Sequence, residues 1–165
     1  MKKMKNKIIL ASSSPRRKEL FDKYGIDYTV DFVETEEVLD ESLTLFKRLE
    51  NIALQKAKPL QIKYPNNIIV SADTMVTFQD EMLGKPKNRE DAKRMLELLS
   101  NNKQVVITAV CIIKDQQSTT FTDATTVTFK KLSDQEIEDY LDTNEWQGKA
   151  CLCNPRSCFK VCRKD

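Results

Sequence analysis

The stretch of this chain best suited to chemistry is a serine- and arginine-rich turn within residues 8–17, IILASSSPRR. Ser14 is a favourable helix N-cap residue, and Pro15 fits the first helical position, where its missing N–H costs nothing. Such a turn offers free backbone N–H groups and the positive end of a helix dipole, to which hydroxyl and guanidinium groups add further donors. These residue types at this spacing predict a phosphate-binding site.

The same residues have ordinary interpretations. A Ser-Pro-Arg-Arg string also occurs in flexible basic linkers and phosphorylation sites, and both arginines could simply be solvated. The apolar run before the turn predicts a buried strand, and a helix is predicted after it, ending near Gly25. These flanking elements favour the phosphate site.

An aspartate within an apolar strand is the second candidate. Residues 67–78, NIIVSADTMVTF, alternate as a strand does and place Ser71 and Asp73 on one face. A carboxylate in such a strand is costly unless it is paired or takes part in chemistry, and perturbed carboxylates concentrate at functional sites. We therefore favour a functional role for Asp73 over structural capping.

Other charged residues could complete a site. Glu34, Glu36 and Glu37 form either a solvated turn or a set of metal-binding carboxylates facing the arginine turn. Lys56 lies in the last turn of a predicted helix, where a positive charge is favourable in itself.

The elements that must position these residues alternate between strand and helix. Strands are predicted at residues 8–11, 28–33, 67–78, 105–113 and 121–129, and helices at residues 15–24, 42–57, 88–100 and 133–143. Ser42 is a plausible cap for the second helix, and Ser133 and Glu136 form a capping box for the fourth. A hairpin turn at residues 79–81 interrupts the alternation. The sequence thus predicts an α/β fold with a mixed central β-sheet flanked by helices.

Composition limits the classes of function. The 165 residues, 40% hydrophobic and 32% charged, suit a single domain, and the net charge of +2 gives no general attraction to nucleic acid or membrane. The apolar run near the start is too short for a signal peptide or a membrane span, so we expect a cytoplasmic protein. The chain contains no histidine, which excludes Ser-His-Asp triads and histidine metal ligands.

Several stretches in order along the chain resemble the Maf-like nucleoside triphosphate pyrophosphatases. They are LASSSPRR (10–17), IALQKA (52–57), SADTMV (71–76), LGKPKNREDAKRMLELLS (83–100), TAVCII (108–113) and TVTFKKLSDQEIEDYLDTNE (126–145). One such string is weak, but the ordered set over residues 7–150 is highly specific. The resemblance implies a Maf/ITPase-like fold and a cytoplasmic homodimer. It also implies hydrolysis of nucleoside triphosphates to monophosphate and pyrophosphate with Mg²⁺ or Mn²⁺.

Roles for single residues follow from the same resemblance. Asp73 is similar to the family's proton acceptor, and Arg16, Lys56 and Lys85 are similar to its phosphate contacts. Ser12 lies in the same anion-binding turn. A carboxylate can activate water for attack on phosphorus, and cations can spread the charge that develops on phosphate oxygens.

Substrate choice and metal binding involve further positions. Thr74 resembles the branch that prefers dTTP and UTP, whereas a branch with Asp-Gln at this place prefers 7-methyl-GTP; Arg16 is the second specificity residue. Glu36 or Glu37 could help hold the metal, since a hard cation prefers oxygen ligands.

The chain departs from the family pattern in two places. Asn-Asn-Lys-Gln104 stands where the family usually has a histidine, away from the catalytic positions. After Ala150 the family continues with a Gly-Ala-Tyr-Gly-Ile-Gln-Gly-like segment, a strand pair and a helix, whereas this chain reads CLCNPRSCFKVCRKD. The tail at residues 151–165 predicts no regular element, and no residue in it matches the family glutamine that contributes to nucleotide selection. We expect an exposed sheet edge and impaired activity.

Two hypotheses address this tail. Its four cysteines could form a metal site, but their spacing fits zinc poorly, and a disulfide role is not expected in the cytosol. Alternatively, the tail is translated out of frame. Codons can be chosen for it that, read one base later, encode VYAIQGLASKFVEK, which contains the family's Tyr-x-Ile-Gln-Gly core. We favour the frameshift.

Three functions are therefore compared. The first is the pyrophosphatase, with a nucleoside triphosphate as its partner and no nucleic acid or membrane. The second is a non-catalytic nucleotide-binding regulator of septum formation and cell division. The third is a small metal-binding interaction protein that uses the cysteine tail.

Overall fold

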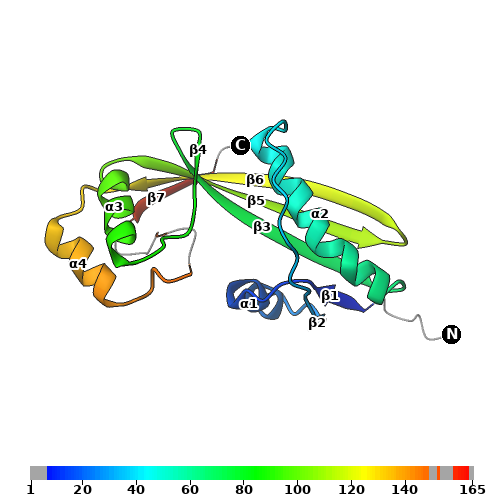
Figure 1. Cartoon of the computed structure of the whole chain (residues 1–165). Coiled ribbons are helices and arrows are strands. Elements are labelled where there is room, and N and C mark those ends of the chain that lie inside the picture. The colour runs from blue at the N-terminus through cyan, green and yellow to red at the C-terminus, as the bar shows by residue number, and fades with distance from the viewer. Residues whose placement is uncertain (1–6, 149–151, 153–157, 164–165) are drawn as a thin grey trace. The chain divides into compact units, whose positions relative to one another are not determined.

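The structure is a computed structural model that describes residues 7–148, residue 152 and the backbone of residues 158–163. Its strands are β1 (Ile8–Leu10), β2 (Tyr28–Val30), β3 (Ile68–Phe78), β4 (Glu81–Leu83), β5 (Lys103–Lys114), β6 (Gln117–Phe129) and β7 (Cys158–Arg163). Its helices are α1 (Pro15–Lys23), α2 (Leu45–Lys63), α3 (Arg89–Leu99) and α4 (Asp134–Asp142) (Figure 1).

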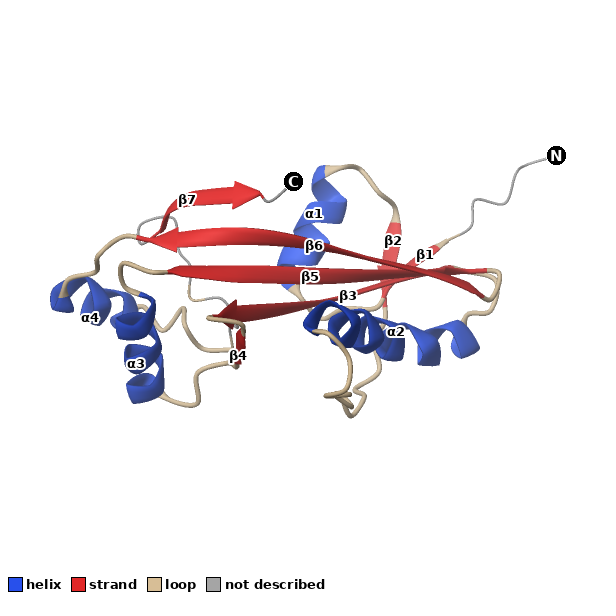
Figure 2. Ribbon diagram, turned by 90° about the horizontal axis from the view of Figure 1, so that it is seen from above, coloured by secondary structure: helices blue, strands red, loops and turns tan. Residues whose placement is uncertain are grey.

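The described strands form a mixed sheet. Its order is β2-β1-β3-β5-β6-β7, and β4 pairs with β3 off this path. β1 runs parallel to both β2 and β3, whereas β4 is antiparallel to β3 and β7 is antiparallel to β6 (Figure 2). The predicted α/β fold with a mixed sheet is confirmed.

The chain divides into two compact units. The first comprises Met1–Asp73 and Thr108–Thr122, and the second comprises Thr74–Ile107 and Asp123–Asp165. The division falls within β3, β5 and β6, so each unit holds a part of these strands. The serine turn, α2 and Asp73 all belong to the first unit.

In the first unit, α2 packs on β3 through a stripe of buried residues at helical spacing, namely Leu49, Ile52, Ala53, Ala57 and Leu60. The predicted boundaries of this helix are wrong at both ends. It is capped by Thr44, which accepts a hydrogen bond from the Lys47 N–H, and it passes through Pro59 to Lys63. A proline inside a helix costs about 3 kcal/mol. The complete burial of Leu60 just beyond it opposes that cost.

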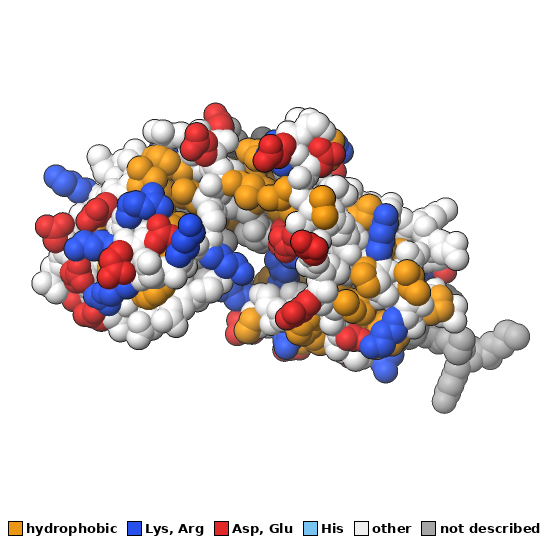
Figure 3. Space-filling view, in the orientation of Figure 1, with side chains coloured by type: hydrophobic (Ala, Val, Ile, Leu, Met, Phe, Trp, Pro, Cys, Tyr) orange, Lys and Arg blue, Asp and Glu red, His pale blue; other side chains and the backbone are white. Residues whose placement is uncertain are grey.

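The second unit has its own hydrophobic core. This core contains Phe78, Ala92, Met95, Leu96, Leu99, Val127, Phe129, Leu132, Ile137, Tyr140, Leu141, Trp146 and Leu152. The Asn88 side chain caps α3 by accepting a hydrogen bond from the Asp91 N–H, and the predicted Ser133–Glu136 capping box of α4 is confirmed. Arg89 bridges α3 to α4 by ion pairs with Glu138 and Asp142, and charged side chains of both signs gather over these helices (Figure 3).

Two hairpins shape the longer strands. The predicted turn after β3 is confirmed, with Gln79 and Asp80 at φ values of 52° and 64°. A second two-residue turn, Asp115-Gln116, also has positive φ values, 49° and 63°. This backbone conformation matches the twist of paired strands. β5 and β6 therefore continue to the turn and are longer than predicted.

The structure also differs from prediction in the tail. No element is predicted after residue 150, yet β7 pairs antiparallel with β6, from Thr125 opposite Arg163 to Phe129 opposite Cys158. Phe159 and Val161 have high strand propensity, and the edge of β6 supplies backbone hydrogen-bond partners. Pairing along a sheet edge needs no hydrophobic period in the added strand.

Candidate active site

The serine turn forms where the chain leaves the sheet. The Ala11 N–H still donates to the Val70 carbonyl at 2.8 Å, and α1 begins four residues later at Pro15. Ser14 occupies the predicted N-cap position, but its side chain makes no capping hydrogen bond; its own N–H donates to Ser12 Oγ at 3.2 Å. The first-turn N–H groups are therefore not capped by Ser14, which suits an anion-binding turn.

Arg17 lies against this turn from the first turn of α1. Its Nη1 donates to Ser12 Oγ at 3.1 Å and to the Ala72 carbonyl at 2.8 Å. Burial lowers the pKa of Arg17 and the nearby negative charge of Asp73 partly opposes this, while the guanidinium stays charged at neutral pH. The helix N-terminus is thus joined to the strand residue that precedes Asp73.

The sequence places both arginines in the predicted phosphate-binding turn, and the family resemblance assigns an individual role to Arg16 alone. Arg16 is exposed, and its roles in phosphate binding and specificity stay predictions. Helical spacing could have revealed the difference, because Arg17 and Phe21 are four residues apart and share the half-buried face of α1. Phe21 packs edge-on against Tyr28 with ring centroids 5.2 Å apart, which fixes that face toward β2.

Asp73 lies at the end of the first unit's part of β3, opposite α2. Its Oδ1 accepts a hydrogen bond from Lys56 Nζ at 2.8 Å, and its side chain is 19% exposed. The same ammonium lies 2.9 Å from Glu37 Oε1, so Lys56 bridges two carboxylates. Burial lowers the pKa of Lys56, but Asp73 and Glu37 together outweigh this and raise it above the ordinary value.

The spacing of β3 and α2 explains this pairing. Ser71 and Asp73 share a strand face as predicted, and that face meets α2: Ser71 Oγ donates to the Ala53 carbonyl at 2.5 Å, one helical turn before Lys56. α2 ends at Lys63, so Lys56 lies within the helix. The alternative explanation of Lys56 as a favourable charge at a helix C-terminus is therefore wrong.

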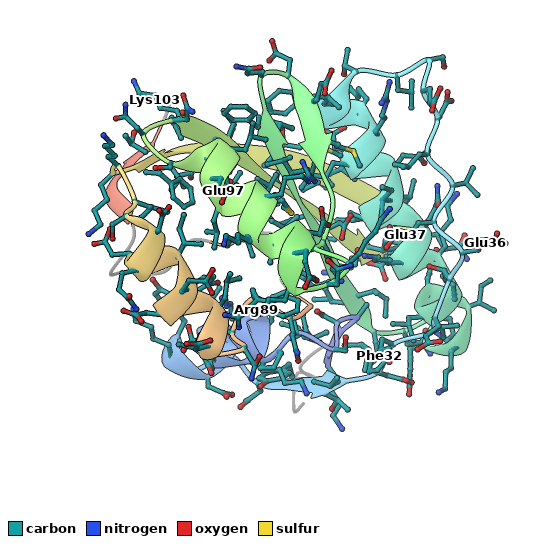
Figure 4. The ribbon with its side chains drawn as sticks, turned by 60° about the vertical axis from the view of Figure 1, so that its left-hand side comes forward. Phe32, Glu36, Glu37, Arg89, Glu97 and Lys103 are labelled. Atoms are coloured by element: carbon teal, nitrogen blue, oxygen red, sulfur yellow. The ribbon has the colours of Figure 1, made fainter. Side chains whose placement is uncertain are left out.

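The two predicted metal carboxylates differ in position. Glu37 contacts Lys56 beside α2, whereas Glu36 points away from the helix toward solvent (Figure 4). Within residues 7–148 and residue 152, no group of three or more acidic, histidine or cysteine side chains is placed to hold a metal ion. The site therefore offers two convergent carboxylates, those of Glu37 and Asp73.

A polar cluster that the sequence did not predict joins the segment after β2 to the end of α2. Asp31 Oδ2 accepts hydrogen bonds from Lys63 Nζ and Tyr64 Oη, both at 2.7 Å. The hydrogen bond from Lys63 and, to a smaller extent, the one from Tyr64 lower the pKa of Asp31. This contact fastens the chain after β2 to the end of α2, and so constrains the segment that carries Glu37.

Other predicted residues belong elsewhere. Lys85 and Thr74 are in the second unit, and their roles stay predictions. The cysteine tail, with its metal-site and frameshift hypotheses, lies outside the residues whose side chains the structure describes. Cys111 is a buried free thiol, and burial raises its pKa. Among the described helices, none combines the length and apolar character needed to cross a membrane.

Comparisons with known proteins find matches along most of this chain. The family model described as "Maf-like protein" matches residues 7–154. The dTTP/UTP pyrophosphatase of Acholeplasma laidlawii is 44% identical over 146 residues, which are 87% of this chain and 76% of that protein. The dTTP/UTP pyrophosphatase of Bacillus velezensis is 42% identical over 147 residues, 89% of this chain and 78% of that protein.

A solved structure is also similar at a low level. The Staphylococcus aureus Ham1 protein aligns over 74% of this chain and 71% of its own, with a TM-score of 0.49 and 16% identity. The family match over residues 7–154 agrees with the resemblance found over residues 7–150. Together with relatives above 40% identity along most of their length, it places this chain in the Maf-like protein family.

Proposed function

We propose that this protein hydrolyses nucleoside triphosphates, with dTTP and UTP as preferred substrates, to the nucleoside monophosphate and pyrophosphate. The observation that carries the proposal is the part-buried Asp73 carboxylate held at 2.8 Å by Lys56, in the same unit as the serine turn. The relatives named dTTP/UTP pyrophosphatase support this choice of substrate.

The proposed reaction is an attack of water on the α-phosphorus. Asp73 accepts a proton from the water molecule while the water oxygen bonds to the α-phosphorus. The bond from the α-phosphorus to the bridging oxygen of the β-phosphate breaks. Pyrophosphate leaves with the bonding electrons. In this proposal Ser12, Arg16, Lys56 and the first turn of α1 bind phosphate oxygens, and Lys85 is a further phosphate contact that the family resemblance implies.

The described residues fit a divalent cation. The carboxylates of Glu37 and Asp73 both contact the Lys56 ammonium, so they converge on a position that suits a positive charge. Mg²⁺ is commonly bound by one or two protein carboxylates together with substrate phosphates and water, so a pair of carboxylates is sufficient. Bound there, Mg²⁺ or Mn²⁺ would neutralise charge on the transferred phosphate. Lys56 would then be free to turn to a phosphate oxygen.

Substrate choice and assembly are further parts of the proposal. Thr74 and Arg16 would select the pyrimidine nucleotide, and the protein would act as a homodimer in the cytoplasm, where its substrates are found. The net charge of +2 gives no reason to expect nucleic acid as a partner. A non-catalytic regulator is not favoured, because nucleotide binding alone would not require a carboxylate in the sheet.

Pyrophosphate release from purified protein tests the proposal. The substrates are dTTP, UTP and 7-methyl-GTP, each with Mg²⁺ or Mn²⁺, and chelated samples serve as controls. We expect release from dTTP and UTP to exceed release from 7-methyl-GTP. Nucleotide binding without turnover would instead support the regulator.

A further inference from the structure

The register of the sheet shows that Arg17 replaces a missing backbone donor. β1 and β3 pair in parallel, with Leu10 opposite Val70, and the Ala11 N–H donates to the Val70 carbonyl. In the same register the next donor, two residues on, would be a backbone N–H reaching the Ala72 carbonyl. The chain has by then turned away toward α1, and Arg17 Nη1 donates to the Ala72 carbonyl at 2.8 Å.

The same guanidinium orients a hydroxyl of the serine turn. Ser12 Oγ accepts from Arg17 Nη1 at 3.1 Å and from the Ser14 N–H at 3.2 Å. A hydroxyl has two acceptor positions and one hydrogen, so these two bonds leave the hydrogen as the group that Ser12 can contribute. Ser12 is 5% exposed, so water does not compete strongly for this orientation.

We propose that Arg17 is a positioning residue: it fixes the serine turn against the strand that carries Asp73 and orients the Ser12 hydroxyl as a donor to a phosphate oxygen of the substrate. Arg17 acts through Ser12 and the Ala72–Asp73 peptide and does not itself contact the reacting atoms. This inference rests on the proposed function, which makes the serine turn a triphosphate site.

A lysine could not substitute fully in this role. Its ammonium is a single point charge, whereas the planar guanidinium presents several donors in a fixed geometry to two acceptors on different elements. We therefore expect Arg17→Lys to keep the fold and to restore only part of the phosphate affinity that Arg17→Met loses.

The test measures binding of inorganic tripolyphosphate by calorimetry, because this probe reports on the turn without any turnover. The proteins are wild type, Arg17→Met, Arg17→Lys, Ser12→Ala and the double variant Arg17→Met/Ser12→Ala. Lys23→Met removes an exposed cation from the same helix and is the matched control. Thermal unfolding identifies the variants that are folded.

We expect Arg17→Met and Ser12→Ala each to weaken binding about ten- to a hundredfold, since the first releases and the second removes the one hydroxyl that donates to the charged phosphate. Because they act through one hydroxyl, the double variant should lose little more than either single variant. Lys23→Met should bind as wild type. For dTTP turnover, Arg17→Met should raise KM more than it lowers kcat.

Several results would overturn the inference. These are unchanged tripolyphosphate affinity in folded Arg17→Met, fully additive losses in the double variant, or wild-type affinity in Arg17→Lys. If Arg17→Met does not fold, Arg17→Lys and Ser12→Ala decide the question, and unchanged affinity in either of them overturns the inference. Tripolyphosphate binding by a wild-type protein that does not hydrolyse dTTP would refute the proposed function and leave the positioning role standing.

Discussion

Lys56 holds Asp73 from across the space between α2 and β3, with Nζ 2.8 Å from Oδ1 and the same nitrogen 2.9 Å from Glu37 Oε1. These are charge-assisted contacts in a part-buried place, with 25% of the Lys56 side chain exposed and 19% of that of Asp73. They join three elements, namely the loop after β2, the helix and the strand. An incoming cation or phosphate must therefore act on all three side chains.

Removing the Lys56 ammonium should increase metal affinity while it lowers activity. In Lys56→Met the carboxylates of Glu37 and Asp73 face each other without a cation, which favours Mn²⁺ in the absence of nucleotide. Turnover of dTTP should fall about a hundred- to a thousandfold, as expected when a group that stabilises the transition-state charge is lost. Titration followed by electron paramagnetic resonance measures free Mn²⁺. Equal Mn²⁺ affinity in variant and wild type would contradict this arrangement.

Glu37 should matter for metal activation more than Glu36. Glu37 contacts Lys56 and Glu36 points to solvent, so Glu37→Gln should require a higher Mn²⁺ concentration for half-maximal activity (Figure 4). Glu36→Gln should change this concentration little, and Glu41→Gln in the same loop is the control. The larger effect in Glu36→Gln would place the metal elsewhere in the loop.

Arg16→Ala should raise KM and lower kcat together. A guanidinium on a triphosphate interacts in both the ground state and the transition state, so its loss affects binding and the chemical step. Steady-state kinetics with dTTP and UTP measure both constants. A wild-type kinetic profile would remove Arg16 from the site and leave Arg17 as the functional arginine of the turn.

Asp31 should contribute to stability above its ordinary pKa and lose this contribution in acid. Its folded pKa is lowered by Lys63, so the unfolded state takes up a proton first as the pH falls below about 3.9. Stability should decline from there through the lower folded pKa. In Asp31→Asn the unfolding midpoint should depend less on pH over this window. Parallel midpoint curves for the two proteins would show that the Asp31 contact contributes nothing.

Features of the fold that local sequence patterns determine were predicted correctly. Alternation along residues 67–78 placed Ser71 and Asp73 on one face, and the structure sets that face against α2. The Ser133–Glu136 capping box was likewise a local pattern, and it is confirmed. Short-range periodicity and capping chemistry decide such features before tertiary contacts form.

Features that depend on tertiary contacts were missed. The role of Arg17 was not predicted because its partner, the Ala72 carbonyl, is 55 positions away in the sequence. That carbonyl has no backbone donor from β1 because the chain turns away from the sheet toward α1. α2 passes Pro59 because Leu60 is buried, which outweighs a local helix-breaking signal. β7 was not predicted because its sequence has no strand pattern of its own. The strand forms by pairing with the edge of β6.

The release of pyrophosphate from dTTP by wild type and Asp73→Asn tests the proposed function most directly. Asparagine keeps the size of the side chain but cannot accept a proton from water, so Asp73→Asn should lose about a hundred- to ten-thousandfold in turnover. Circular dichroism should show an unchanged fold. A folded Asp73→Asn protein that releases pyrophosphate at the wild-type rate would contradict the role of Asp73 as the proton acceptor.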